Sequence, residues 1–87
     1  MVQRRKMSIS HHAKLRIAER VPDRLGYPSD EQLAIAARYK GRVIKGRSKT
    51  HLIKVMYKGF LFVYQYTANN YLLVTLYNKD EGAIENG

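Results

Sequence analysis

The chain contains no cysteine, and its 87 residues include no long apolar run. Without cysteine, disulfides, thiolate zinc sites and cysteine nucleophiles are excluded. No segment approaches the roughly 18 consecutive apolar residues that a membrane span requires. The basic residues at the start are not followed by the apolar stretch of a secretory signal. We therefore expect no membrane partner and a cytoplasmic location.

Acidic residues are scarce and unevenly placed. The chain has 16 Lys and Arg against 7 Asp and Glu, a formal net charge of +9, and residues 32–79 contain no acid. A field of this kind attracts polyanions and speeds encounter with them. Because solubility alone is usually provided by charges of mixed sign, the basic balance favours a nucleic-acid partner.

The scarcity of acids also limits the chemistry. Metal-dependent cleavage of phosphodiesters normally needs clustered carboxylates, and Glu19 is the only acid well placed near the basic residues 12–20. His11 and His12 are adjacent, so on a helix they point about 100° apart and form a poor chelate. The stretch "GRVIKGRSK" lacks the ending and the following helix of a phosphate-binding loop. We expect no metal site and no cofactor.

Periodicity predicts two helices followed by four strands. Ser8 or Ser10 can cap a first helix that ends near Arg20, before Pro22. The stretch "PSDEQLAIAARYKG" predicts a second helix, with a capping box at its start and a glycine at its end. Alternation of period two predicts strands in "RVIKGR", "THLIKVMY", "FLFVYQYT" and "YLLVTLYN". We expect an α+β fold with two N-terminal helices packed on a four-stranded, mainly antiparallel sheet (ααββββ).

The chain divides into one domain and two flexible ends. We expect a flexible basic arm over residues 1–7, a single α+β domain over residues 8–79, and a flexible acidic tail over residues 80–87. Alternation gives the sheet an aliphatic side, which we expect the helices to cover, and a tyrosine-rich side. With a two-residue turn at Asn69-Asn70, Thr75 and Tyr77 are expected on the tyrosine-rich side.

His12, Arg16 and Arg20 recur every fourth residue along one side of the first helix. Cleavage of RNA without a metal needs a proton-transfer group and cations that hold the phosphate as charge develops. Histidine transfers protons near neutral pH, and the planar fork of arginine matches a phosphate. The stripe therefore fits a phosphate site, and the alternative is a solvated helix face.

The acid-free stretch adds candidates for nucleic-acid binding, because cations contact phosphates and tyrosines stack on unpaired bases. The candidates from this stretch are Arg42, Lys45, Arg47, Lys49, His51, Lys54, Tyr64 and Tyr66, and the first helix adds Arg20. Lys49 and His51 are also secondary candidates for the chemistry. The alternative for the tyrosines is an aromatic strand pair that stiffens the sheet.

The stretch "ISHHAKLRIAERV" resembles the first helix of a group of small bacterial and phage proteins and toxin C-terminal domains. Their pattern is Ser-x-His-Ala-x-x-Arg-x-x-x-Arg, which is matched here by Ser10, His12, Ala13, Arg16 and Arg20. Their last strand is similar to "VTLY" at positions 74 to 77. These domains are grouped with the RelE, colicin D, colicin E5 and barnase-like ribonuclease superfamily. The link "VPDRLGYP" is longer than the usual step between their helices.

The resemblance implies a helical layer on a curved antiparallel sheet and a metal-independent, toxin-like endoribonuclease. It carries His12, Arg16, Thr75 and Tyr77 over as catalytic residues. The partner it implies is RNA, with the ribosome, an antitoxin or a host nucleic-acid enzyme as further partners. The alternative is a non-catalytic, basic, phage-type factor that binds nucleic acid or a host nucleic-acid-processing enzyme.

Overall fold

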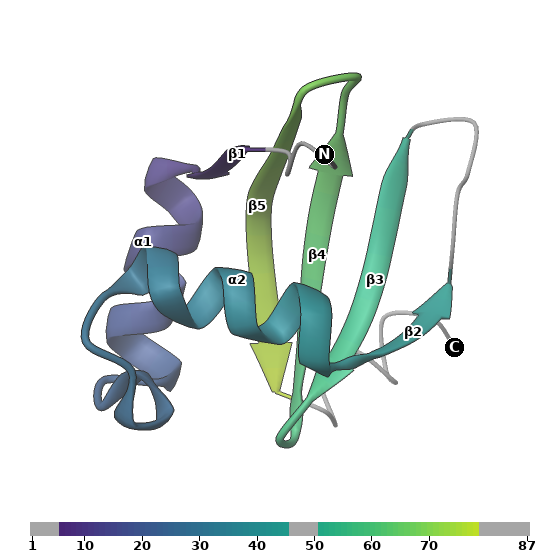
Figure 1. Ribbon diagram of the computed structural model, residues 1–87. Coiled ribbons are helices and arrows are strands. Elements are labelled where there is room, and N and C mark those ends of the chain that lie inside the picture. Colours follow the sequence, from purple (N-terminus) through teal and green to yellow (C-terminus); the bar gives the residue numbers. More distant parts are fainter. Residues whose placement is uncertain (1–5, 46–50, 79–87) are drawn as a thin grey trace.

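The computed structural model describes residues 6–45 and 51–78. Its elements are β1 (Lys6–Ile9), α1 (His11–Arg20), the 3₁₀ helix η1 (Arg24–Gly26), α2 (Asp30–Lys40), β2 (Arg42–Lys45), β3 (Leu52–Tyr57), β4 (Phe60–Tyr66) and β5 (Asn70–Asn78). The strands form one sheet in the order β1-β5-β4-β3-β2. Helix α2 crosses one face of the sheet, and α1 lies beside β5 (Figure 1).

The predicted four-stranded, mainly antiparallel sheet preceded by two helices (ααββββ) is wrong. Within the described residues the sheet has five strands and is mixed, because Lys6–Ile9 precedes α1 and pairs in parallel with β5. Lys6 and Met7, which were expected in a flexible arm, belong to this strand. A four-residue strand carries little periodic signal, and its partner lies at the other end of the domain. Residues 1–5 and 80–87 lie outside the described residues.

The hairpin between β3 and β4 follows the predicted register. Tyr57 pairs with Phe60 across the two-residue turn Lys58-Gly59. Both turn residues have positive φ, 49° and 88°, which is the conformation of a type I′ turn. Glycine is suited to the second position because it has no Cβ to clash there.

A β-bulge in β5 changes which side chains face the helices. Val63 pairs with Thr75 but Tyr64 pairs with Leu73, so Val74 is the extra residue. As a result Leu73 and Leu76 both lie in the core at 0% exposure. Thr75 follows Val63 onto the opposite face, and Tyr77 follows Thr75. The prediction that Thr75 and Tyr77 share a face with Tyr64 is therefore wrong.

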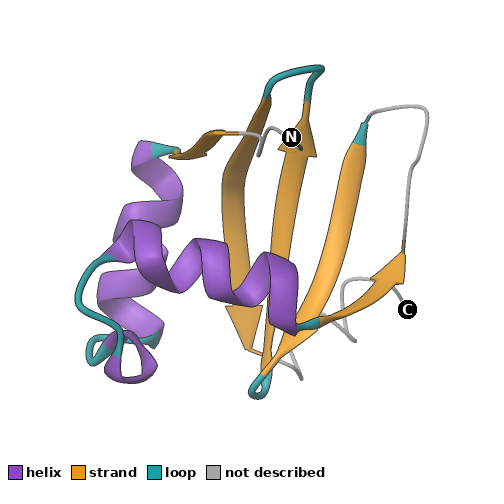
Figure 2. Ribbon diagram, in the orientation of Figure 1, coloured by secondary structure: helices purple, strands orange, loops and turns teal. Residues whose placement is uncertain are grey.

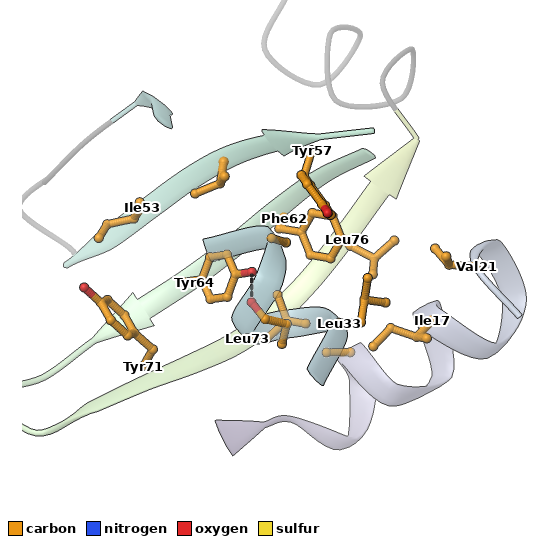
Figure 3. Close-up of a cluster of buried hydrophobic side chains, with 14 residues drawn as sticks. Ile17, Val21, Leu33, Ile53, Tyr57, Phe62, Tyr64, Tyr71, Leu73 and Leu76 are labelled. Atoms are coloured by element: carbon orange, nitrogen blue, oxygen red, sulfur yellow. Dashed lines mark hydrogen bonds between the residues drawn. The ribbon is translucent and has the colours of Figure 1, made fainter. Parts of the chain in front are cut away.

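The core lies on the tyrosine-rich side of the sheet, so the prediction that the helices cover the aliphatic side is also wrong. Figure 3 shows Ile17 and Leu33 from the helices packed over Phe62, Tyr64 and other sheet residues. The hydroxyl of Tyr64 donates to the Ala34 carbonyl of α2 at 2.8 Å, shown by the dashed line. Because this polar atom has a partner, the large ring can be buried without an unsatisfied group.

Capping residues and a glycine determine where the two helices begin and end. Ser10 caps α1 by accepting from Ala13 N–H, and Ser29 caps α2 by accepting from Gln32 N–H. Gly41 ends α2 where the chain turns into β2, a connection that Figure 2 shows as a short loop. A Cβ at Gly41 would lie 2.5 Å from Val55 Cγ1, so only glycine lets α2 approach the sheet so closely.

Candidate functional site

Helix α1 orients the predicted basic stripe. Its inner face carries Ala13 and Ile17, at 0% and 1% exposure. This packing leaves His12 exposed and Arg16 and Arg20 half-buried. The two arginines therefore lie at the margin between the buried and the exposed faces of α1.

Arg16 joins α1 to the last strand. Its Nε donates to His12 Nε2 at 3.4 Å, and its Cζ lies 5.9 Å from the centre of the Tyr77 ring. His12 Nε2 is the acceptor in this bond. A histidine, an arginine and a tyrosine from opposite ends of the domain are thus in one chain of contacts.

Thr75 is the least satisfied polar group near these residues. It is 7% exposed, and its Oγ1 has no hydrogen-bond partner in the described part of the chain. It lies two residues before Tyr77 on β5, so both side chains project from the same face. Buried hydroxyls nearly always have partners, and because the Thr75 oxygen is itself buried, a ligand could bond to it only after neighbouring side chains move. We call His12, Arg16, Thr75 and Tyr77 the α1–β5 cluster.

Two predicted nucleic-acid residues share the face of the sheet that carries Thr75 and Tyr77. Arg42 begins a row of paired residues, Arg42–Met56–Leu61–Tyr77, and directly opposite residues project from the same face. Lys54 begins a second row through Val63 to Thr75. Leu61 and Val63 are buried, at 2% and 6% exposure. Along these two rows, the polar side chains are therefore Arg42 and Lys54 at the β2–β3 end and Tyr77 and Thr75 at the β5 end.

Three further predicted residues, Tyr64, His51 and Tyr66, are not brought to the cluster. Tyr64 is fully buried in the core, so its ring is not available to stack on a base. His51 and Tyr66 contact each other edge to face at 5.5 Å on the helix-covered side. The backbone of Lys45 pairs with that of Lys54, and the predictions for Arg47 and Lys49 lie outside the described residues.

Burial and hydrogen bonding change the pKa values of three tyrosines, none of which belongs to the α1–β5 cluster. Burial raises the pKa of Tyr64, which keeps its hydroxyl as a donor to α2. The hydroxyls of Tyr27 and Tyr57 lie 2.7 Å apart. This hydrogen bond lowers the pKa of Tyr27 and, together with burial, raises the pKa of Tyr57. The pair ties the link between the helices to β3.

A further role of Ser10 was not predicted from the sequence. Besides capping α1, its hydroxyl donates to the Val74 carbonyl at 2.8 Å. No sequence signal indicated this bond, because it depends on β1 and on the bulge in β5.

Within residues 6–45 and 51–78, no helix is long and apolar enough to cross a membrane. The same residues contain no group of three or more His, Asp or Glu that could hold a metal ion. No family model, no curated protein and no solved structure matches the chain. The geometry of the α1–β5 cluster and the charge of the chain are therefore the basis for a functional proposal.

Proposed function

We propose that this protein is a cytoplasmic RNA-binding protein that cleaves RNA without a metal ion at the α1–β5 cluster. The observation that carries the proposal is the chain of contacts from His12 through Arg16 to Tyr77. A proton-transfer group, a phosphate-binding cation and a phenol are the groups that this chemistry uses. The net charge of +9 supports a polyanionic substrate.

In this proposal His12 is the general base. Its Nε2 takes the proton of a ribose 2′-hydroxyl, and the 2′-oxygen attacks the adjacent phosphorus. The bond from phosphorus to the 5′-oxygen breaks, which leaves a 2′,3′-cyclic phosphate. The Arg16–His12 bond is long at 3.4 Å, whereas arginine binds phosphate through shorter, charge-assisted bonds. Binding of a phosphate therefore draws Arg16 away and frees the lone pair of His12.

The two residues of β5 complete the reaction. Tyr77 gives its hydroxyl proton to the leaving 5′-oxygen. Water then carries the proton that His12 took up to the Tyr77 phenolate, which restores both groups. When the side chains that cover Thr75 move aside, its hydroxyl donates to a non-bridging oxygen of the phosphate, where the negative charge increases in the transition state. Arg42 and Lys54, on the same face of the sheet, hold neighbouring phosphates and give binding its salt dependence.

The proposal is tested by incubating the protein in EDTA with a single-stranded RNA labelled at its 5′ end. We expect cleavage to products that end in a 2′,3′-cyclic phosphate, and no cleavage where the nucleotide 5′ of the bond is 2′-deoxy. His12→Ala should lower kcat/KM by about 100-fold or more. His11→Ala is the matched control, because His11 is the adjacent exposed residue on α1 and projects elsewhere. Cleavage that persists in His12→Ala, or stops in EDTA, would refute the mechanism.

The exposure of His12 favours one second candidate, a non-catalytic factor that binds nucleic acid. A histidine open to solvent lacks the water-excluding surroundings that strengthen catalysis. Salt-sensitive RNA binding that is the same in His12→Ala, with no cleavage by the wild-type protein, would select this candidate. Cleavage that appears only when ribosomes are added would keep the catalytic proposal and identify the ribosome as a partner.

A further inference from the structure

Ser10 connects the two elements that carry the α1–β5 cluster. Its backbone N–H donates to the Leu73 carbonyl at 3.0 Å, which continues the pairing of β1 with β5. Its Oγ accepts from Ala13 N–H at 3.0 Å and donates to the Val74 carbonyl at 2.8 Å. One hydroxyl therefore caps α1 and bonds to β5 at the same time.

The bond to Val74 falls on the extra residue of the β-bulge. A bulged residue is left out of the regular ladder, so its carbonyl benefits from a partner outside the sheet. The bulge also decides the direction of the residues after it. Without it, alternation would place Thr75 and Tyr77 on the same side as Leu73, in the core. With it, Tyr77 projects to the side where Arg16 contacts its ring.

We propose that Ser10 is a positioning residue for the α1–β5 cluster, because its hydroxyl fixes the start of α1 against the bulge of β5. The inference rests on the proposed function for its catalytic consequence. His12 and Arg16 follow Ser10 by two and six residues on α1, while Thr75 and Tyr77 follow Val74 by one and three residues on β5. Removing the bond that the hydroxyl donates lets the start of α1 shift relative to the bulge, although the backbone pairing of β1 with β5 remains.

The two roles of the hydroxyl can be separated chemically. Ser10→Asp retains the cap, because a carboxylate accepts from Ala13 N–H and suits a helix N-terminus. It has no proton to donate to the Val74 carbonyl, which it repels instead. Ser10→Gly also removes the donor and costs a helix cap only a few tenths of a kcal/mol. Ser10→Thr retains both bonds. Ser29→Asp is the matched control, because Ser29 caps α2 in the same way.

The experiment measures RNA cleavage and thermal stability of the full chain, with nuclear Overhauser signals between the Tyr77 ring and the Arg16 side chain as a direct readout. We expect Ser10→Asp and Ser10→Gly to stay folded, to abolish those signals, and to lower kcat by about 100-fold, as a displacement of about 1 Å does. The effect on KM should be small. Ser10→Thr and Ser29→Asp should preserve the signals and cleave like the wild type.

The outcomes separate this inference from the proposed function. If Ser10→Asp or Ser10→Gly cleaves as well as the wild type, or preserves the Overhauser signals between Arg16 and Tyr77, Ser10 is only a helix cap and the inference is overturned. If the wild-type protein does not cleave RNA, the proposed function fails, and the Overhauser signals alone decide whether Ser10 positions the cluster. Their disappearance in both variants, with persistence in Ser10→Thr, then supports the positioning role.

Discussion

Replacing Thr75 by valine should stabilise the protein and impair its function. The side chain is 7% exposed, and its hydroxyl has no partner among the described residues. A buried hydroxyl without a hydrogen bond costs about 1–3 kcal/mol of desolvation. Valine has nearly the same shape and forms strands equally well, so Thr75→Val removes that cost and leaves no cavity. We expect a gain of about 1 kcal/mol in the free energy of unfolding.

Urea denaturation followed by circular dichroism measures this gain as a higher midpoint at an unchanged m-value. In a thermal scan, 1 kcal/mol corresponds to about 4–8 °C for a domain of this size. The matched control is Thr67→Val. Thr67 is exposed and its Oγ1 accepts from Asn70 N–H at 3.1 Å, so the same chemical change should destabilise there.

The same substitution should lower RNA cleavage, since valine offers no hydrogen bond to a phosphate oxygen. A stabilised variant with reduced activity is typical of a residue retained for function. A loss of about 1 kcal/mol or more in Thr75→Val would show that the hydroxyl is hydrogen-bonded in solution. In that case the hydroxyl of Thr75 would have no free hydrogen-bonding capacity for a ligand.

Three further predictions concern the framework of the fold. Tyr64→Phe should cost about 1 kcal/mol at neutral pH by removing the bond to Ala34. Burial raises the pKa of Tyr64 above the value near 10 of an unfolded tyrosine. Above that pH, Tyr64 lowers the free energy of unfolding of the wild type by about 1.4 kcal/mol per pH unit, and a phenylalanine at this position has no such effect. Urea midpoints of the two proteins should therefore converge and cross near pH ~11, and a constant difference would contradict the burial of the hydroxyl. Gly41→Ala should cost about 1–3 kcal/mol in urea denaturation, because its Cβ would lie 2.5 Å from Val55 Cγ1 and 2.6 Å from the Ala37 carbonyl; an unchanged midpoint would show that α2 can shift. Arg24→Gln should change stability by less than about 1 kcal/mol, because the Arg24–Asp30 ion pair at 2.7 Å is 44% and 27% exposed; a larger loss that salt does not reduce would show that the pair is effectively buried.

Features with local causes could be predicted from the sequence. The second helix was predicted from its capping box and its terminal glycine, and α2 (Asp30–Lys40) confirms it. The end of α1 before Pro22 and the hairpin at Lys58-Gly59 are likewise confirmed. In each case a residue restricts the backbone at its own position. The sequence pattern that predicts the feature therefore lies within a few residues of it.

Features that depend on distant partners could not be predicted. Strand β1 forms because it pairs in parallel with β5. Its four residues are too few for their own alternation to predict a strand. The bulge at Val74 shifts the second half of β5 by one residue, which reverses the faces of Thr75 and Tyr77. The tyrosine-rich side is the core, and the hydroxyl of Tyr64 is satisfied there by a carbonyl of α2, a partner that the strand's own alternation does not show. The contact of Arg16 with Tyr77 follows from all three.

The pairing of β1 with β5 also sets the order of assembly during synthesis. Synthesis makes β1 and α1 before β5, so the nascent chain carries His12 and Arg16 before Tyr77 exists. Ser10 and Val74, which bond across the junction, are 64 residues apart, and contacts at such separation are slow to form. Under the proposed function, a growing chain that lacks β5 also lacks Thr75 and Tyr77 and therefore has no complete α1–β5 cluster. The α1–β5 cluster is complete only once β5 has joined β1 in the sheet.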